Sequence, residues 1–295
     1  MISILFFFVI SIFFSFFMSY FFNKKINNYD VPGKNKIHLK KILTSAGFFP
    51  YIVFSVFLTF LIFSKDFSIK QDYFNKIPQI WFAPLAIIVL TIISFFDDFH
   101  YIPYQIRLVF QIAITFVGVS LFPINSVFNI QTPLFLGYVP VKIDLVFTII
   151  FWVFIINSTN FIDGSDGTHI FQSASVFLTL SIIFYLINQN FYFVISLFNF
   201  LLSFIFLFFN FNKKFKMFMG DSGSIPCGFV MGWLLITLIN MGYFVTGLLI
   251  NIIFIMDVFI TLLRRIINKK SIFERHNDFF FKNFLKYFCL LIALG

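Results

Sequence analysis

The chain has 295 residues, of which 60% are hydrophobic and 11% are charged, and its formal net charge is +9. A soluble domain carries about 25% charged residues, so this composition excludes an ordinary water-soluble globule and a disordered chain. The basic residues stand in short clusters between apolar stretches, which is typical of membrane loops and not of a nucleic-acid-binding face. Both cysteines, Cys227 and Cys289, lie in apolar stretches and cannot form a disulfide framework or a zinc site.

Ten apolar stretches predict membrane-spanning helices, because a helix needs about 20 apolar residues to cross a bilayer. Open sheet edges are not tolerated in lipid, so we predict an all-α, polytopic integral membrane protein with one transmembrane domain over residues 1–295. The first stretch lacks a basic start and a small-residue cleavage site, which favours a span over a signal peptide. The predicted spans are residues 2–22, 43–63, 79–96, 104–122, 141–157, 169–187, 191–209, 222–240, 242–262 and 282–295.

The loops between these spans fall into two sets that differ in basic charge. One set holds fourteen Lys and Arg residues, whereas the other holds only Lys65, Lys70 and Lys76. Cytoplasmic loops carry an excess of Lys and Arg, so the first set is predicted to be cytoplasmic and both termini extracytoplasmic. The cytoplasmic loops are residues 23–42, 97–103, 158–168, 210–221 and 263–281.

Five of the twelve acidic residues lie at helix ends on this predicted cytoplasmic face. They come from three loops that are far apart in the sequence. Carboxylates that converge on one membrane face can form a divalent-cation site, and Mg²⁺ prefers hard oxygen ligands together with substrate phosphates. Solvated acids at helix ends are the alternative interpretation. The five residues are Asp97, Asp98, Asp163, Asp166 and Asp221.

Two polar segments carry most of these acids. In the first segment Asn157, Asn160, Asp163 and Asp166 recur at every third position. An α-helix drifts by half a turn over nine residues, so all four side chains converge only if the segment is unwound or 3₁₀. In the second segment, residues 218–224, glycines flank an aspartate where a helix begins. A helix N-terminus favours an anion such as phosphate, and an ordinary N-cap is the alternative.

These motifs resemble the polyprenyl-phosphate N-acetylhexosamine-1-phosphate transferases, which are integral membrane enzymes that begin cell-envelope polysaccharide assembly. The resemblance covers nearly the whole chain, with the motifs in the family's order and at predicted cytoplasmic positions. The matching features are Val31-Pro32 with His38 and Gly47, Asp97-Asp98 with Arg107 and Gln111, Asn157 to Gly167 for N-x-x-N-x-x-D-G-x-D-G, Phe218 to Ser224 for F-M-G-D-x-G-S, and Asp257 with Arg264-Arg265.

The sequence departs from the family's pattern in three loops, one of which has Phe211 where the family often has Asn, with Asn210 and Asn212 on either side. The first loop of the family carries Pro-Thr-Pro-Arg-Gly-Gly, whereas residues 41–47 read Lys-Ile-Leu-Thr-Ser-Ala-Gly. The last cytoplasmic loop of the family holds a His cluster. Here His276 matches the first His of an H-x-x-H pattern, but Phe279 stands in place of the second. Because of this substitution, two alternatives stay open: a divergent member of the family or an inactive one.

The resemblance implies that a UDP-N-acetylhexosamine and undecaprenyl phosphate react to give undecaprenyl-diphosphate-sugar and UMP. The expected location is the bacterial inner membrane, with multiple spans and the catalytic loops in the cytoplasm. The reacting phosphates are both anionic, so Mg²⁺ and basic residues must neutralise their charge, and Mn²⁺ is an alternative cation. By the family's pattern, Asp221 and Asp98 are the expected metal ligands.

The resemblance also assigns the other site residues. The expected catalytic residues are Asp97, Asp98, Asp163 and Asp166; one of the first two would position or deprotonate the lipid phosphate. The expected substrate-binding residues are Asn157, Asn160, Phe218, Arg107, His276 and His38. Phe218 matches a position where the family stacks an aromatic ring on uracil, and Arg107 could instead snorkel to the membrane interface. His100 and His169 flank the acidic motifs, and we interpret both as incidental.

Other functions stay open on the sequence alone. A transporter or flippase would place polar residues near the bilayer midplane, often in repeated halves, but here the acids crowd one face and no repeat is visible. A non-catalytic homologue that binds polyprenyl phosphate is supported by the altered His motif. The compact loop 263–281 favours N-acetylglucosamine or a deoxy-N-acetylhexosamine over a muramyl-pentapeptide. The sequence does not fix the oligomeric state, and a homodimer stays open.

Overall fold

The computed structural model describes residues 2–31, 41–63, 79–100, 102–122, 141–163, 167–211 and 214–269. Almost all of this part of the chain is helical. The helices are α1 (Ile2–Lys25), α2 (Phe48–Phe63), α4 (Gln79–Phe99), α5 (Tyr104–Ser120), α6 (Val141–Ile162), α7 (Thr168–Leu186), α8 (Asn190–Phe211), α9 (Asp221–Asn240), α10 (Phe244–Ile250) and α11 (Ile252–Ile267). Two short strands, β1 (Tyr29–Asp30) and β2 (Ile42–Leu43), pair antiparallel with Tyr29 opposite Leu43.

The prediction of an all-α polytopic membrane protein is confirmed. Within the described part of the chain, five helices are long and apolar enough to cross a membrane, namely those over 80–99, 143–162, 169–186, 190–211 and 221–240. Two shorter apolar helices, α2 and α5, lie within the second and fourth predicted spans, but residues 43–47 of the second predicted span precede α2 and are not helical. The predicted span 282–295 lies outside the described residues, so the total of ten spans stays a prediction.

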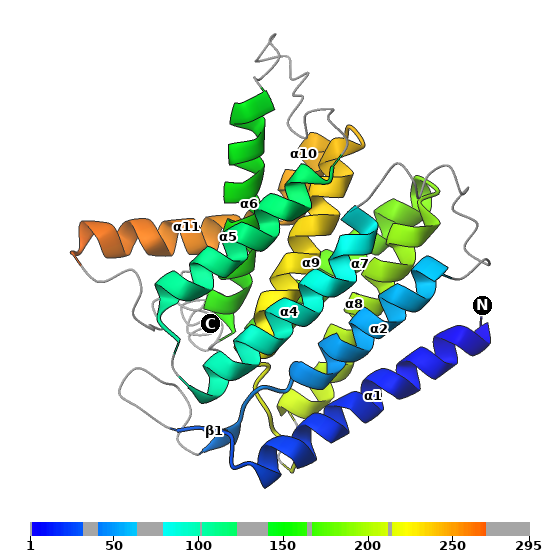
Figure 1. Cartoon of the computed structure of the whole chain (residues 1–295), viewed down its shortest axis with the longest axis vertical. Helices are drawn as coiled ribbons and strands as arrows, with labels where there is room; N and C mark the ends of the chain where they lie inside the picture. The colour runs from blue at the N-terminus through cyan, green and yellow to red at the C-terminus, as the bar shows by residue number, and fades with distance from the viewer. Residues whose placement is uncertain are drawn as a thin grey trace, which may run out of the picture.

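The ninth predicted span, 242–262, is wrong as a single helix. Its residues form two helices, α10 and α11, and the segments Phe244–Ile250 and Ile255–Ile267 meet at an angle of 64°. Figure 1 shows α11 projecting from the side of the bundle, whereas the other long helices run alongside one another. The hydropathy of this stretch gives no sign of the break, because both halves are apolar.

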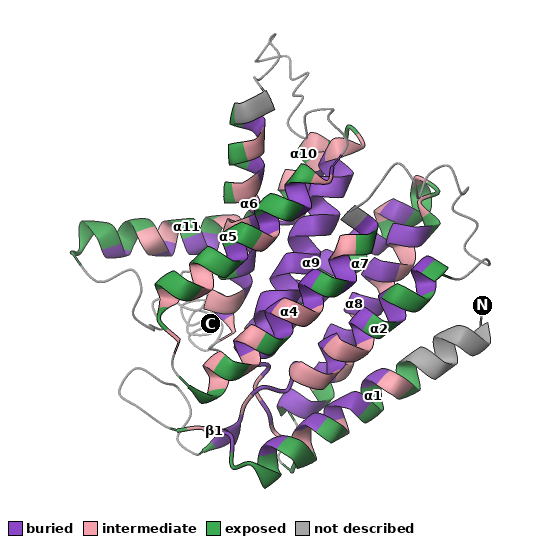
Figure 2. Ribbon diagram, in the orientation of Figure 1, coloured by how far each residue is buried: buried purple, intermediate pink, exposed green. Residues whose placement is uncertain are grey.

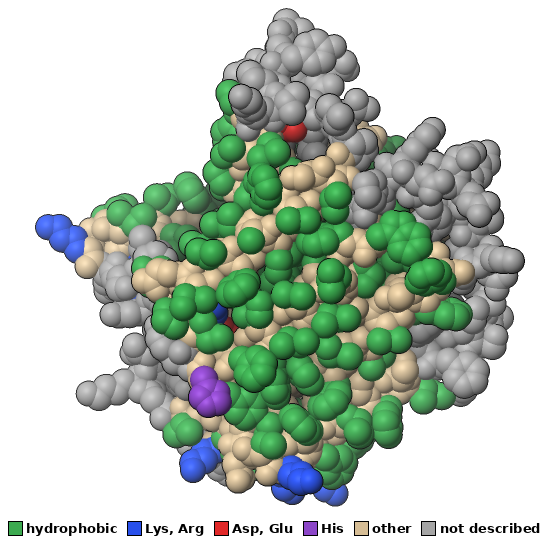
Figure 3. All heavy atoms as spheres, viewed as in Figure 1, with side chains coloured by type: hydrophobic (Ala, Val, Ile, Leu, Met, Phe, Trp, Pro, Cys, Tyr) green, Lys and Arg blue, Asp and Glu red, His purple; other side chains and the backbone are tan. Residues whose placement is uncertain are grey.

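Helix α9 forms the centre of the bundle. All of its apolar window is buried inside the structure, and Figure 2 shows it as buried along its length, with α4, α6, α7 and α8 beside it. The outer helices bury about half of their residues or less and expose apolar side chains such as Leu85 and Val109. Figure 3 shows hydrophobic side chains over the flank of the bundle that faces the viewer. Lys and Arg lie at the lower end of the bundle and on the tip of α11. Such a surface fits lipid at the flank and water at the end of the bundle.

Glycines let α9 approach its neighbours closely. A Cβ atom on Gly232 would lie 2.4 Å from Cδ1 of Trp152, and one on Gly228 would lie 2.7 Å from the Cα atom of Ile156. The Trp152 ring stacks on Phe229 with a centroid distance of 4.9 Å, and its Nε1–H donates to the Phe229 carbonyl at 2.9 Å. The contact between α6 and α9 therefore depends on two glycines spaced four residues apart, which is the small-residue packing that membrane helices use.

Replacing Gly228 by Ala should separate α6 from α9, because the added methyl group meets backbone atoms that cannot rotate away. We expect a loss of about 2 kcal/mol in the free energy of unfolding, the usual cost of overpacking a core. The buried thiol of Cys227 provides the measurement: its reaction with a thiol-specific fluorophore in detergent, in a Cys289→Ala background, should begin at a lower temperature.

Gly242→Ala is the matched control. A Cβ atom at Gly242 meets no atom within 4 Å, and only its positive φ of 93° opposes the substitution. This variant should lose less stability than Gly228→Ala. Equal unfolding temperatures for the two variants would show that close approach at Gly228 does not matter.

Candidate active site

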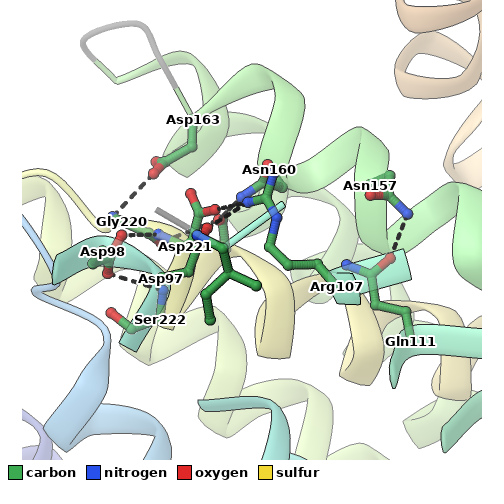
Figure 4. A network of polar contacts seen from close by, with 12 residues as sticks. Asp97, Asp98, Arg107, Gln111, Asn157, Asn160, Asp163, Gly220, Asp221 and Ser222 are labelled. Atoms are coloured by element: carbon green, nitrogen blue, oxygen red, sulfur yellow. Dashed lines mark hydrogen bonds and ion pairs between the residues drawn. The ribbon is translucent and has the colours of Figure 1, made fainter. Parts of the chain in front are cut away.

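Four carboxylates and one guanidinium gather at the end of the bundle where α9 begins. Asp97 and Asp98 end α4, Asp163 follows α6, and Asp221 is the first residue of α9. We call these four residues the carboxylate cluster. Arg107, from the first turn of α5, reaches into the cluster (Figure 4). The prediction that acids from three loops converge on one face is confirmed for these four residues.

Arg107 links two of the carboxylates. One nitrogen, Nη1, donates to Oδ2 of Asp97 at 2.6 Å and also contacts Oδ2 of Asp221. The backbone amide of Ile102 donates to the other oxygen of Asp97 at 2.8 Å. The side chains of Asp97 and Asp221 are only 7% and 13% exposed, so water does little to screen their charges from one another. The guanidinium therefore offsets the repulsion between two partly buried carboxylates.

Asp98 caps the N-terminus of α9 from another helix. Its two oxygens accept hydrogen bonds from the backbone amides of Asp221 at 3.0 Å and Ser222 at 3.2 Å. Amides at a helix start have no partner within the helix, and a carboxylate there is favoured by the helix dipole. The anion at this helix start is thus the carboxylate of Asp98, where the sequence favoured a bound phosphate.

Asp163 holds the residue that precedes α9. Its Oδ2 accepts a hydrogen bond from the amide of Gly220 at 3.0 Å, so three consecutive amides at the start of α9 bind carboxylates. Gly220 has a φ of 72°, in the left-handed region. A Cβ atom there would also lie 2.8 Å from Oδ2 of Asp98. Glycine is therefore needed at this position both for its backbone conformation and for space.

His169 lies beside the other carboxylate oxygen of Asp163, Oδ1, although its place in the sequence suggested an incidental residue. Its Nδ1 is 3.6 Å from Oδ1 of Asp163, and its Nε2 is 3.3 Å from the hydroxyl of Ser173. The imidazole is 1% exposed. Its position as the second residue of α7, just after the acidic motif, was the available signal for this contact.

Asn157 and Asn160 remain in α6, which is helical through Ile162. The unwinding that would bring the whole motif together does not occur over these residues. Asn160 donates from Nδ2 to the hydroxyl of Ser224 in α9 at 3.1 Å. Asn157 instead donates to Oε1 of Gln111 at 2.6 Å, and Figure 4 shows this amide pair to one side of the carboxylate cluster. The two asparagines, three residues apart on α6, thus bind partners on different helices, α5 and α9.

The remaining predicted site residues fall in two groups. Phe218 is half-buried, and the Nζ of Lys216 lies 5.9 Å from the centre of its ring. Its proposed stacking on uracil stays a prediction. Three other predicted residues lie outside the described part of the chain: His38, Asp166 and His276.

The residues described in the structure do not make a complete metal site by themselves. Among them, no three His, Cys, Asp or Glu side chains are grouped as metal ligands. Two carboxylates, those of Asp97 and Asp221, converge on one cationic nitrogen, whereas both oxygens of Asp98 accept hydrogen bonds. A divalent cation could share Asp97 and Asp221 only if phosphate oxygens or water completed its coordination, which is the usual arrangement for Mg²⁺.

Comparison with known proteins identifies the class. The model of glycosyl transferase family 4 matches residues 80–239, more than half of the chain. This chain belongs to that family. The matched residues include α4 to α9 and all four members of the carboxylate cluster.

Several curated relatives carry the name phospho-N-acetylmuramoyl-pentapeptide-transferase. The Streptococcus uberis protein is 31% identical over 227 residues, which are 73% of this chain and 65% of that protein. The Streptococcus pyogenes serotype M49 protein is 29% identical over 251 residues, 79% of this chain and 70% of that protein. The Aliarcobacter butzleri protein is 36% identical over 110 residues, 31% of each chain. The chain thus spans from about a third to 70% of the length of these relatives.

Replacing Arg107 by Gln should destabilise the protein near neutral pH, because Asp97 and Asp221 would then face each other without the cation that joins them. We expect a loss of about 2 kcal/mol, less than for a fully buried ion pair because the arginine side chain is 25% exposed. Thermal unfolding in detergent without divalent cations is the measurement. Adding Asp97→Asn to the variant should restore part of the loss.

Lys25→Gln is the control for this experiment. It removes the same charge from an exposed position in the last turn of α1, so its unfolding temperature should stay close to that of the unmodified protein. If Asp97→Asn failed to improve Arg107→Gln, repulsion between the carboxylates could not be the cause of the loss.

Proposed function

We propose that this protein transfers N-acetylhexosamine-1-phosphate from a UDP-sugar to undecaprenyl phosphate and releases UMP. The observation that carries the proposal is the carboxylate cluster with Arg107, held at one end of a membrane bundle in a member of glycosyl transferase family 4. A lipid phosphate can reach such a position from the membrane and a nucleotide-sugar from the water. The name of the relatives, a phospho-sugar-peptide transferase, supports the same reaction class.

The charges of the cluster suit a cation-assisted transfer between two anionic phosphates. Four carboxylates against one guanidinium leave an excess of negative charge, which would repel both substrates unless a cation offsets it. Asp97 and Asp221 are the residues that would hold Mg²⁺, or Mn²⁺ in its place. The bound cation would offset the charge that develops on the transferred phosphoryl group.

Asp98 is proposed to act by position and not as a metal ligand. Both of its oxygens already accept amide hydrogen bonds from the start of α9. We therefore propose Asp97 as the second ligand of the cation, in place of Asp98, which the resemblance implied. A phosphomonoester has a second pKa of about 6 and is largely dianionic at neutral pH, so the lipid nucleophile needs little help from a base. The chain would contribute mainly orientation and charge neutralisation.

Arg107 is proposed to bind a substrate phosphate once a cation has taken its place between Asp97 and Asp221. Its side chain is a quarter exposed, and its guanidinium donates from a single nitrogen to both carboxylates, which leaves other N–H groups of the fork for a phosphate. Asn157 and Gln111, paired at 2.6 Å beside the cluster, present amide groups near this arginine (Figure 4). They are placed to contact the nucleotide end of the donor.

The proposed location is the bacterial inner membrane, with the carboxylate cluster on the cytoplasmic side. Basic residues support this orientation, because Lys24 and Lys25 end α1 and Lys214 and Lys216 lie in the loop that leads to α9. The hydroxyl of Tyr20 in α1 donates to the carbonyl of Lys214 at 3.2 Å, which joins the two basic segments at the same end of the bundle. The product would serve the first membrane step of a cell-envelope polysaccharide.

Release of UMP by the purified protein tests the proposal. The assay contains undecaprenyl phosphate, Mg²⁺ and a panel of donors: UDP-N-acetylglucosamine, a UDP-deoxy-N-acetylhexosamine and UDP-N-acetylmuramoyl-pentapeptide. We expect UMP with one donor, dependent on lipid and on Mg²⁺, and restored by Mn²⁺ after chelation. Asp221→Asn should lower the rate by about 100-fold or more, since it removes a charge from the centre of the site.

Asp30→Asn is the matched control, because it makes the same change in the β-ribbon outside the carboxylate cluster and should keep its activity. Absence of UMP with every donor, from protein that unfolds cooperatively, would overturn the transferase proposal for these donors. Binding of undecaprenyl phosphate without turnover would then support the non-catalytic alternative.

A further inference from the structure

Ser45 lies in the part of the first loop that departs from the family's sequence pattern, yet the structure brings it into the site. Residues 43–47 run beside 217–219: the amide of Phe218 donates to the Leu43 carbonyl at 2.8 Å, and the amide of Ala46 donates to the Phe218 carbonyl at 3.1 Å. Gly47 packs so closely on Gly223 that a Cβ atom on Gly47 would lie 2.1 Å from the Gly223 Cα atom. The divergent loop is thus fixed against the start of α9.

The backbone of Ser45 is in the left-handed region, with a φ of 61°. Few residues other than glycine adopt this conformation, and it persists only where the surroundings impose it. Ser45 is fully buried, and its carbonyl accepts a hydrogen bond from Nδ2 of Asn23 in α1 at 3.2 Å. If backbone shape were the only requirement at this position, glycine would serve better than serine.

The side chain of Ser45 shows what serine provides. Its hydroxyl donates to Oδ2 of Asp98 at 2.6 Å, and its oxygen accepts from Nδ2 of Asn28 at 2.8 Å. A hydroxyl has one hydrogen, and the amide of Asn28 directs that hydrogen towards the carboxylate. The same Oδ2 of Asp98 accepts from the amide of Ser222 at the start of α9. Ser45 and α9 therefore hold one carboxylate oxygen from two sides.

We infer that Ser45 is a positioning residue for Asp98, and that its hydroxyl fixes the orientation in which this carboxylate holds the start of α9 and Asp221. Asn23 and Asn28 in turn hold Ser45 in its left-handed conformation. This role rests on the proposed function for its effect on turnover, but its structural effect at α9 does not. The first loop contributes to the site through different residues from those of the family's usual motif.

A pair of variants separates the hydroxyl from the backbone. Ser45→Gly removes the hydroxyl and relieves the backbone strain, whereas Ser45→Ala removes the hydroxyl and keeps the strain. Asn27→Gly is the control, because Asn27 also has a positive φ, of 55°, but lies at an exposed position after α1. Ser45→Gly is expected to fold even if Ser45→Ala does not, since glycine suits the left-handed backbone.

Amide hydrogen exchange at Asp221 and Ser222 is the first readout and needs no substrate. Without the hydroxyl, Asp98 loses one of three donors, so these amides should exchange about tenfold faster in both Ser45 variants and unchanged in Asn27→Gly. In the UMP-release assay, both variants should lower kcat by about tenfold and leave KM for the UDP-sugar within about twofold.

The two readouts separate this inference from the proposed function. Wild-type exchange and wild-type kcat in Ser45→Gly would overturn the positioning role, because a purely structural position would tolerate glycine. If the unmodified protein releases no UMP, the transferase proposal fails, and the exchange rates alone then decide whether Ser45 holds Asp98. Faster exchange in Asn27→Gly as well would assign the effect to backbone flexibility and also overturn the role.

Discussion

The backbone amides that begin α9 need acceptors, and the way they obtain them builds the site. A helix start leaves amides without partners inside the helix, and at the buried residues Gly220 and Ser222 little water is at hand to take their place. Here α9 is buried along its span, and its first amides bind the carboxylates of Asp98 and Asp163. The carboxylates gain donors and the favourable end of a helix dipole, and α9 gains a fixed start.

These hydrogen bonds between carboxylates and backbone amides mean that the charged groups are ordered before any ligand binds. Asp98 is held by α9 and Ser45, Asp163 by Gly220, and Asp97 by Arg107 and the loop that follows α4. Preorganised charges stabilise a transition state without first having to be rearranged. The guanidinium is the exception, because the Arg107 side chain is more exposed than those of Asp97 and Asp221 and sits where a smaller cation could replace it.

The sequence was sufficient for most of the described membrane helices and for the gathering of Asp97, Asp98, Asp163 and Asp221, because hydropathy and the placement of acids at helix ends act over whole segments. It did not predict which acceptor each amide finds, since that depends on how α4, α6 and α9 meet in space. The spacing of Asn157 and Asn160 suggested a shared site, but the two side chains bind partners on different helices, α5 and α9. Ser45 went unnoticed because its role comes from a backbone conformation and a contact with Asp98, which lies 53 residues away.

Trp152 has a consequence for the site although it lies inside the bundle. Its indole fills the space between Gly118 of α5 and Gly232 of α9, where a Cβ atom would lie 2.9 Å and 2.4 Å from the ring. The Trp152 side chain thus sets the spacing of α5, α6 and α9. The same three helices carry Arg107, Asn160 and Asp221. Tilting any one of them would force the ring against the other two. The indole of Trp152 therefore sets the spacing between α5 and α9, and with it the distance between Arg107 and Asp221.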